Sequence, residues 1–117
     1  MPSWGFLTNH AHVLIRVTQH PRSTVRQIAL ATGLTERATL AILQDIRREG
    51  IIIAERQGRR NTYSIDFEAL KRYPFWGPSE TPLPESLIQA TARALARVAG
   101  KPARASRTAL EMGTSPP

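Results

Sequence analysis

Two helix-capping signals separated by a glycine constrain the fold of this chain more than any other feature. Thr24 is followed three residues later by Gln27, which is the spacing of a capping box, and Thr35 can cap a second helix that begins at Glu36. Gly33 lies between them and can adopt the positive φ that ends one helix and turns the chain sharply. The sequence therefore predicts two helices joined by a tight turn, with the N-terminal half of the second helix projecting outward.

Apolar residues at helical spacing predict one buried face on each of three helices. The first helix begins after Thr8 and continues to about Gln19, and the last of the three continues to about Glu49, where Gly50 ends it. The positions expected in the core are Ala11, Val13, Leu14, Ile15, Val17 and Thr18 in the first helix, Val25, Ile28, Ala29 and Thr32 in the second, and Leu34, Ala38, Thr39, Ile42, Leu43 and Ile46 in the third.

A short basic hairpin is expected after the helices. The three isoleucines at 51–53 are β-branched and follow a helix stop, so they predict a strand. Gln57-Gly58 predicts the bend, and Tyr63 and Ile65 alternate with polar residues in a half-buried second strand. Residues 58–61 at the tip include two arginines and no acid, which concentrates positive potential there.

The sequence also predicts how the chain is divided. Residues 1–73 form the compact unit, including an N-terminal segment that carries Trp4 and Phe6 and packs as an arm. Residues 74–84 are rich in proline and predict an extended linker. Residues 85–99 have an apolar stripe at helical spacing, and Gly100 and Pro102 are expected to end that helix. The basic tail at 100–117 is expected to be disordered.

Composition allows a DNA-binding protein and argues against several other classes. The 117 residues carry a net charge of +7, and only Lys71 and Lys101 are lysines, so arginine supplies most of the positive charge. The planar guanidinium group can bind two phosphate or base acceptors at once. The absence of cysteine excludes disulfides and thiolate metal sites and favours the cytoplasm, and we identify neither a signal peptide nor a membrane span.

Catalytic and metal-binding patterns are not found in the sequence. It has no phosphate-binding glycine loop, no nucleophile elbow, no paired carboxylates and no histidine–acid constellation, so we expect no enzyme activity. The three histidines, His10, His12 and His20, are poorly placed to bind one metal ion, and neither a metal nor a cofactor is implied.

Residues 8–66 resemble the winged helix-turn-helix domain of bacterial transcriptional regulators of the MarR and ArsR type. The resemblance rests on Ala29, Gly33, Leu34, the run Thr35-Glu36-Arg37-Ala38, Ile42, Ile46, the exit Gly50-Ile51-Ile52, and the tip Gly58-Arg59-Arg60-Asn61. It implies a mainly α fold with a small β-hairpin, in which a three-helix core is followed by a wing. In that family the third helix reads the major groove of DNA, and the wing lies along the backbone or the minor groove.

The resemblance also implies which residues bind DNA. At the outward positions held here by Leu40 and Ala41, relatives commonly have polar residues, so base readout is expected to rest on Thr35, Glu36, Arg37 and Gln44. An apolar pair can still touch a thymine methyl group. Arg59, Arg60 and Asn61 are expected to contact the backbone or minor groove, and Arg26 a phosphate. Arg47 and Arg48 are expected to form surface pairs with the neighbouring acids.

The function expected from these features is sequence-specific or semi-specific binding of double-stranded DNA by a transcriptional regulator that acts by occupying promoters. The alternative is a winged helix that binds protein within a larger assembly, which Leu40 and Ala41 favour. A unit of this size reads a short half-site, so we expect a homodimer. The dimer contacts are expected from Trp76, Leu87, Ile88, Thr91, Leu95 and Val98. The alternatives are that the helix at 85–99 packs on its own core or on another protein. The sequence identifies no small-molecule effector.

Overall fold

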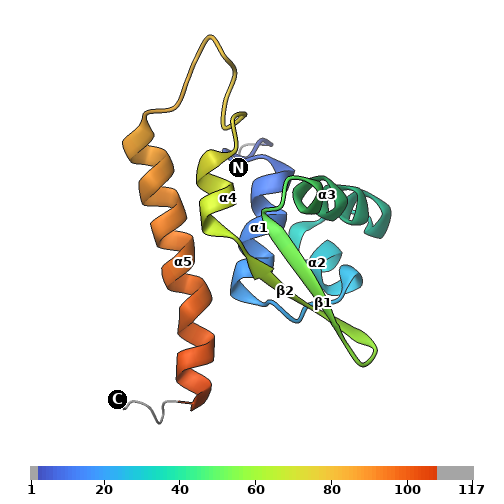
Figure 1. The fold of residues 1–117 in the computed structure, drawn as a ribbon. Coiled ribbons are helices and arrows are strands. Elements are labelled where there is room, and N and C mark those ends of the chain that lie inside the picture. Colours follow the sequence, from blue (N-terminus) through green and yellow to red (C-terminus); the bar gives the residue numbers. More distant parts are fainter. Residues whose placement is uncertain (1–2, 108–117) are drawn as a thin grey trace. The chain divides into compact units, whose positions relative to one another are not determined.

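The computed structural model describes residues 3–107, which belong to two compact units, Met1–Tyr73 and Pro74–Pro117. The first unit contains three helices, a two-stranded antiparallel hairpin and a short fourth helix, and the second contains one long helix (Figure 1). The elements are α1 (Asn9–Gln19), α2 (Val25–Thr32), α3 (Glu36–Arg48), β1 (Ile52–Gln57), β2 (Arg60–Ile65), α4 (Phe67–Arg72) and α5 (Glu85–Arg107).

Threonine caps begin each of the first three helices, as the sequence predicts. The hydroxyl of Thr8 accepts a hydrogen bond from the Ala11 N–H at 3.3 Å, and that of Thr35 accepts one from the Ala38 N–H at 3.0 Å. At α2 both hydrogen bonds of the capping box with Gln27 are present, at 2.9 and 3.1 Å. Each cap satisfies a backbone donor that the first turn of a helix leaves without an intrahelical partner.

The turn between α2 and α3 depends on a left-handed glycine. Gly33 has φ +75°, which L-residues other than glycine rarely adopt, and the Leu34 N–H donates to the Ala29 carbonyl at 3.0 Å. The predicted position of the turn is confirmed. It lets α3 begin at Glu36, only three residues after Gly33.

One face of each of these helices enters a common core. Val13 and Val17 of α1 and Ile28 of α2 are fully buried. Other core residues are Leu14 and Thr18 from α1, Ala29 from α2, Thr39, Ile42, Leu43 and Ile46 from α3, Ile51 just before β1, and Ile52 and Tyr63 from the hairpin. The buried hydroxyl groups of Thr18 and Thr39 donate to carbonyls one turn earlier in the chain, so their burial leaves no donor unsatisfied.

The hairpin pairs β1 with β2 in a register that runs from Ile52 opposite Ile65 to Gln57 opposite Arg60. The loop therefore consists of Gly58 and Arg59, one residue later than the predicted Gln57-Gly58 bend. Gly58 has φ +64°, and a positive φ at the first loop residue gives the tight turns that match the twist of paired strands. The Tyr63 N–H donates to the Pro21 carbonyl at 2.8 Å, which ties β2 to the loop after α1.

Asp66 joins the hairpin to α4. Its backbone N–H donates to the Ile51 carbonyl at 2.8 Å, and its carboxylate accepts hydrogen bonds from the Glu68 and Ala69 N–H groups at 3.0 and 3.1 Å. One residue thus closes the base of the hairpin and caps the next helix.

Three helices followed by a hairpin in this order form a winged helix-turn-helix, as predicted, and we refer to residues 52–65 as the wing. In the N-terminal arm, Trp4 is 71% exposed and Phe6 is 92% exposed, so neither side chain is buried. With regard to membranes, no helix within residues 3–107 has both the length and the apolar content needed to cross a lipid bilayer.

The second unit differs from the sequence prediction in two ways. The segment at 74–84 is not simply extended, because the Thr81 N–H donates to the Pro78 carbonyl at 2.9 Å and a Cβ on Gly77 would come within 2.8 Å of the Leu83 side chain. In addition, α5 does not end at residue 99 but continues through Gly100 and Pro102 to Arg107. Proline has a φ close to that of a helix, so a proline inside one removes one hydrogen bond and need not end it, and the alanines around it are strong helix formers. Residues 108–117 of the predicted tail lie outside the described residues.

We expect substitution of Gly33 to destabilise the first unit through backbone strain alone. A Cβ there would meet no atom within 4 Å, so steric overlap is not the cause. Gly33→Ala should lower the free energy of unfolding by about 1–2 kcal/mol, and Gly33→Val by more, because both disfavour positive φ. Thermal unfolding followed by circular dichroism measures the effect. Gly33→Asn is the control and should cost less, because asparagine tolerates this conformation; equal loss in all three variants would contradict the explanation.

Candidate nucleic-acid interface

The orientation of α3 follows from its buried residues. Thr39, Ile42, Leu43 and Ile46 occupy one side of the helix and enter the core. The opposite side is therefore directed away from the core, and it begins at the capped N-terminus, where Glu36 faces the positive end of the helix dipole. Burial of one side thus determines which side chains α3 presents to a ligand.

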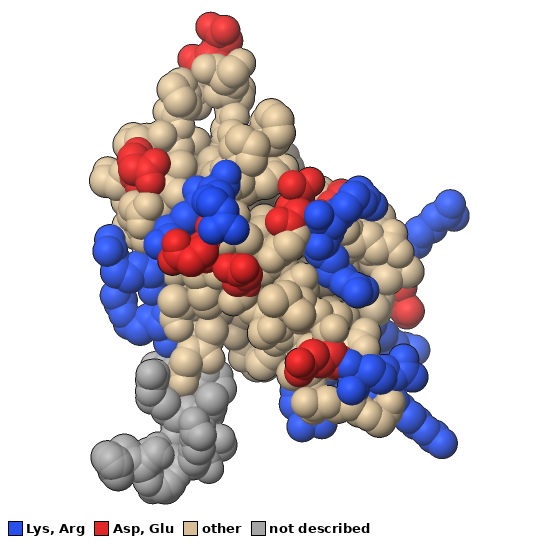
Figure 2. All heavy atoms as spheres, in the orientation of Figure 1, with Lys and Arg blue, Asp and Glu red and all other residues tan. Residues whose placement is uncertain are grey.

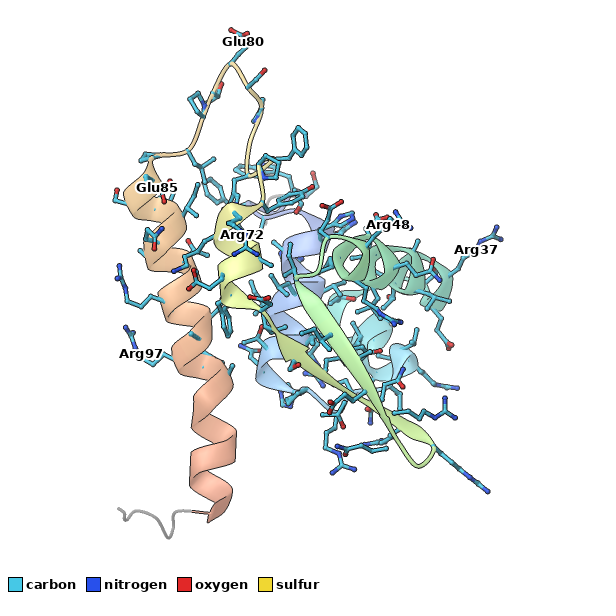
Figure 3. All side chains as sticks on the ribbon, viewed as in Figure 1. Arg37, Arg48, Arg72, Glu80, Glu85 and Arg97 are labelled. Atoms are coloured by element: carbon cyan, nitrogen blue, oxygen red, sulfur yellow. The ribbon has the colours of Figure 1, made fainter. Side chains whose placement is uncertain are left out.

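Most of the residues predicted to read DNA lie on this outward side. Arg37, Leu40, Ala41 and Gln44 are exposed and lie three or four residues apart, so they share one face of the helix. Figure 3 shows Arg37 pointing away from the body of the unit at one end of α3, with Arg48 at the other end. Thr35 and Glu36 are exposed at the start of the helix, although the hydroxyl of Thr35 is already engaged as the cap.

An acidic residue at the edge of this face is paired with two neighbours. The Asp45 carboxylate lies 2.9 Å from Nε2 of His10, which comes from α1, and 3.2 Å from Nη1 of Arg48. The hydrogen bond to His10 is the largest of the effects that lower the pKa of Asp45 below its ordinary value, and the charges of His10 and Arg48 add to it. The pairing of Arg48 with a neighbouring acid was expected, whereas the participation of His10 was not.

The wing carries a third arginine that sequence reasoning did not select. Nε of Arg56 donates to the Gly58 carbonyl at 2.9 Å, so this side chain folds back onto the loop that carries Arg59. Arg56 lies opposite Asn61, and Arg60 lies opposite Gln57. Arg59 and Arg60 are exposed and Asn61 is half-buried, so the tip presents its guanidinium groups to solvent on a braced turn. The sequence signal available was the presence of three arginines within five residues.

The outward end of α3 and the tip of the wing project from the same side of the first unit. In Figure 1 both extend to the right of the core, and Figure 2 shows basic side chains there, which in these two elements are all arginines. Arg26 is also exposed, in the first turn of α2. The structure therefore offers an outward helix face flanked by basic groups, which is an arrangement suited to a polyanion.

Among the described residues, no three His, Cys, Asp or Glu side chains are grouped so that they could hold a metal ion.

Of the known proteins compared with this chain, a solved structure resembles it in fold, and none matches it in sequence. No protein-family model matches the sequence, and no curated protein matches it. A solved structure with a similar fold is that of MepR, a transcription regulator of the Staphylococcus aureus multidrug efflux pump MepA. The two chains are 14% identical, with a TM-score of 0.49, over 92% of this chain and 68% of that one.

The lowered pKa of Asp45 predicts a stability effect in acid. A carboxylate with a lowered folded-state pKa stabilises the fold above its unfolded pKa, near pH 4, and this stabilisation is lost as the pH falls through the lower, folded-state value. Asp45→Asn should therefore lower Tm slightly at neutral pH, and the difference from the parent should disappear in strong acid. Differential scanning calorimetry between about pH 7 and pH 2 tests this. The control is Glu80→Gln, which removes an acid from the 74–84 segment and should show no such convergence; a gap that persists in acid would contradict the assignment.

Proposed function

We propose that this protein binds double-stranded DNA and regulates transcription by occupying promoter sites, with α3 in the major groove and the wing on the adjacent backbone or minor groove. The observation that carries the proposal is the exposed face of α3, held outward by a buried core and accompanied by a basic wing tip on the same side. Regulation by occupancy requires no chemistry at the protein and no cofactor.

The dimensions and side chains of α3 suit the major groove. A helix with its side chains is about 10–12 Å across, and the groove is about 12 Å wide. Arg37 can bind guanine through two hydrogen bonds, Gln44 can bind adenine in the same way, and Glu36 can accept one from cytosine. Leu40 and Ala41 lie on the same face, and the Thr35 backbone lies at the N-terminus of the helix, where phosphate binding is favourable.

The wing and α2 would supply contacts that are independent of sequence. Arg59 and Arg60 are exposed at the tip, Asn61 follows them, and Arg56 braces the loop from which they project. Arg26 in the first turn of α2 can reach a phosphate beside the groove. Contacts of this kind position the protein on the duplex and contribute much of its affinity.

A protein-binding role is the second candidate, and exposed leucines favour it. Leu30 on α2 is 74% exposed and Leu40 on α3 is 47% exposed. An interface with protein would be largely insensitive to salt, whereas binding through several phosphates weakens steeply as salt is added. Selection of preferred duplexes from a random pool, repeated at two salt concentrations, separates the two roles, because only a DNA-binding protein enriches a sequence motif.

DNA binding should depend on the wing and on the first turn of α3. Replacing Arg59 and Arg60 with alanine should weaken binding to all duplexes and reduce the salt slope by about one unit for each phosphate that the protein no longer neutralises. Arg37→Ala should cost about 1–3 kcal/mol on the preferred site if Arg37 reads a base. Fluorescence anisotropy at several salt concentrations measures both effects. Arg72→Ala removes one positive charge from α4 as the control and should leave the slope nearly unchanged. Unchanged affinity in all three variants at moderate salt would exclude this DNA-binding surface.

We further propose that the protein is a homodimer and that α5 contributes to the interface. The support is the apolar stripe of α5, formed by Leu87, Ile88, Thr91, Leu95 and Val98, together with Trp76 in the preceding segment. Two copies would read two half-sites, so the selected motif should be palindromic.

Removal of α5 should convert the dimer to a monomer. Sedimentation of the full chain should give a dimer, and a chain that ends at Glu80 should sediment as a monomer, because it lacks the stripe. Circular dichroism of the shortened chain verifies that the first unit is folded. A full chain that is monomeric well above the concentrations used for DNA binding would disprove the dimer.

A further inference from the structure

Leu40 and Ala41 form a small apolar surface at the middle of the outward face of α3. Leu40 is 47% exposed and Ala41 is exposed, whereas the residues on either side of the pair, Thr39 and Ile42, are 0% and 7% exposed. The neighbouring residues are therefore buried in the core, and this pair faces the solvent. Neither side chain can form hydrogen bonds, so a ligand gains most from this pair if it offers an apolar group.

The surroundings of the pair restrict what that group can be. Arg37 lies one turn before Leu40 and Ala41, Gln44 lies one turn after them, and both are exposed. Among the described residues, Leu40 is the only large, exposed apolar side chain that α3 contributes. Stable protein interfaces bury about 800 Å² on each partner around a continuous apolar centre, and one leucine and one alanine between polar groups do not provide this. A partner with isolated apolar groups on a polar and anionic surface fits better.

Base edges in the major groove have this character. The edges display hydrogen-bond donors and acceptors, and the C5 methyl group of thymine is the apolar feature that protein side chains contact there. We propose that Leu40 and Ala41 contact thymine methyl groups, so that the protein selects sites with thymine opposite the middle of α3. Arg37 and Gln44 would bind guanine and adenine on the two sides of that thymine. This inference rests on the proposed DNA-binding function and adds to it the base that the centre of α3 selects.

The experiment removes the methyl group and nothing else from the base. Deoxyuridine pairs with adenine as thymidine does but lacks the C5 methyl, so a selected duplex is compared with the same duplex in which every thymidine is replaced. The full-length protein should bind the thymidine duplex about fourfold more tightly for each methyl group contacted, which is the effect of burying one such group. Fluorescence anisotropy at constant salt gives the two values of Kd and their ratio.

Variants at position 40 assign the effect to this side chain. Leu40→Ala should bind the thymidine duplex more weakly and lower the ratio by about the fourfold contribution of one methyl contact, because the shortened side chain no longer reaches its methyl group while Ala41 is unchanged. Leu40→Met, which has a similar volume, should retain most of the ratio. The matched control is Leu30→Ala, the same change at an exposed position of α2, and it should leave the ratio unchanged. Both positions are exposed and helical, and alanine and methionine are good helix formers, so the variants should fold.

Each result has one interpretation. A ratio near one in the parent protein, with tight binding to both duplexes, overturns the thymine proposal and leaves DNA binding intact. A high ratio that Leu40→Ala does not reduce also overturns it, because another part of the protein or the stiffness of the duplex then senses the methyl groups. Failure to bind any duplex at low salt would instead defeat the proposed function itself.

Discussion

Four side chains of α3 are buried against the other elements of the first unit, and this burial fixes the rotation of the helix about its own axis. With Ile42, Leu43 and Ile46 in the core, the side of α3 that begins at Arg37 has to face solvent. Gly33 determines where the helix starts, and the buried face determines what the helix presents. The wing is placed by the same core, because Ile52 and Tyr63 enter it together with Ile51, which directly precedes β1. A rigid interior therefore holds both parts of the candidate interface in a fixed arrangement before any ligand is present.

The parts of the fold that could be predicted from the sequence are those encoded by residues close together along the chain. The hydroxyl groups of Thr8, Thr24 and Thr35 act within three residues, and the positive φ of Gly33 is a property of that residue, so helix starts and the turn followed from local chemistry. Predictions from single residues failed where the preference of one residue can be outweighed by the residues around it. Gly100 and Pro102 lower helix stability without abolishing it, and α5 continues through them. Trp4 and Phe6 are apolar residues of a kind that often packs, but they are exposed in this structure.

The candidate site shows the same division. The outward positions of α3 follow from helical spacing, so Arg37, Leu40, Ala41 and Gln44 could be placed on one face from the sequence. The partnership of His10 with Asp45 could not, because the two residues are 35 positions apart and meet only when α1 packs beside α3. The bond from Arg56 to the Gly58 carbonyl joins a strand residue to a loop that lies one residue later than the sequence suggested. Interactions of this kind arise from the assembled structure rather than from any local pattern.

The two attachments of Asp66 link the mobility of neighbouring elements. Its N–H holds the open end of the hairpin to Ile51, and its carboxylate holds the first turn of α4. Because one residue makes both attachments, we expect an opening that frees Asp66 to loosen the start of α4 and the strand ends together, and their backbone amides to exchange with solvent as one cooperative group. The residue that anchors the base of the wing is thus also the N-cap of α4. If α4 frays and Asp66 is released, the hairpin loses the hydrogen bond at its base, and the tip of the wing becomes more mobile.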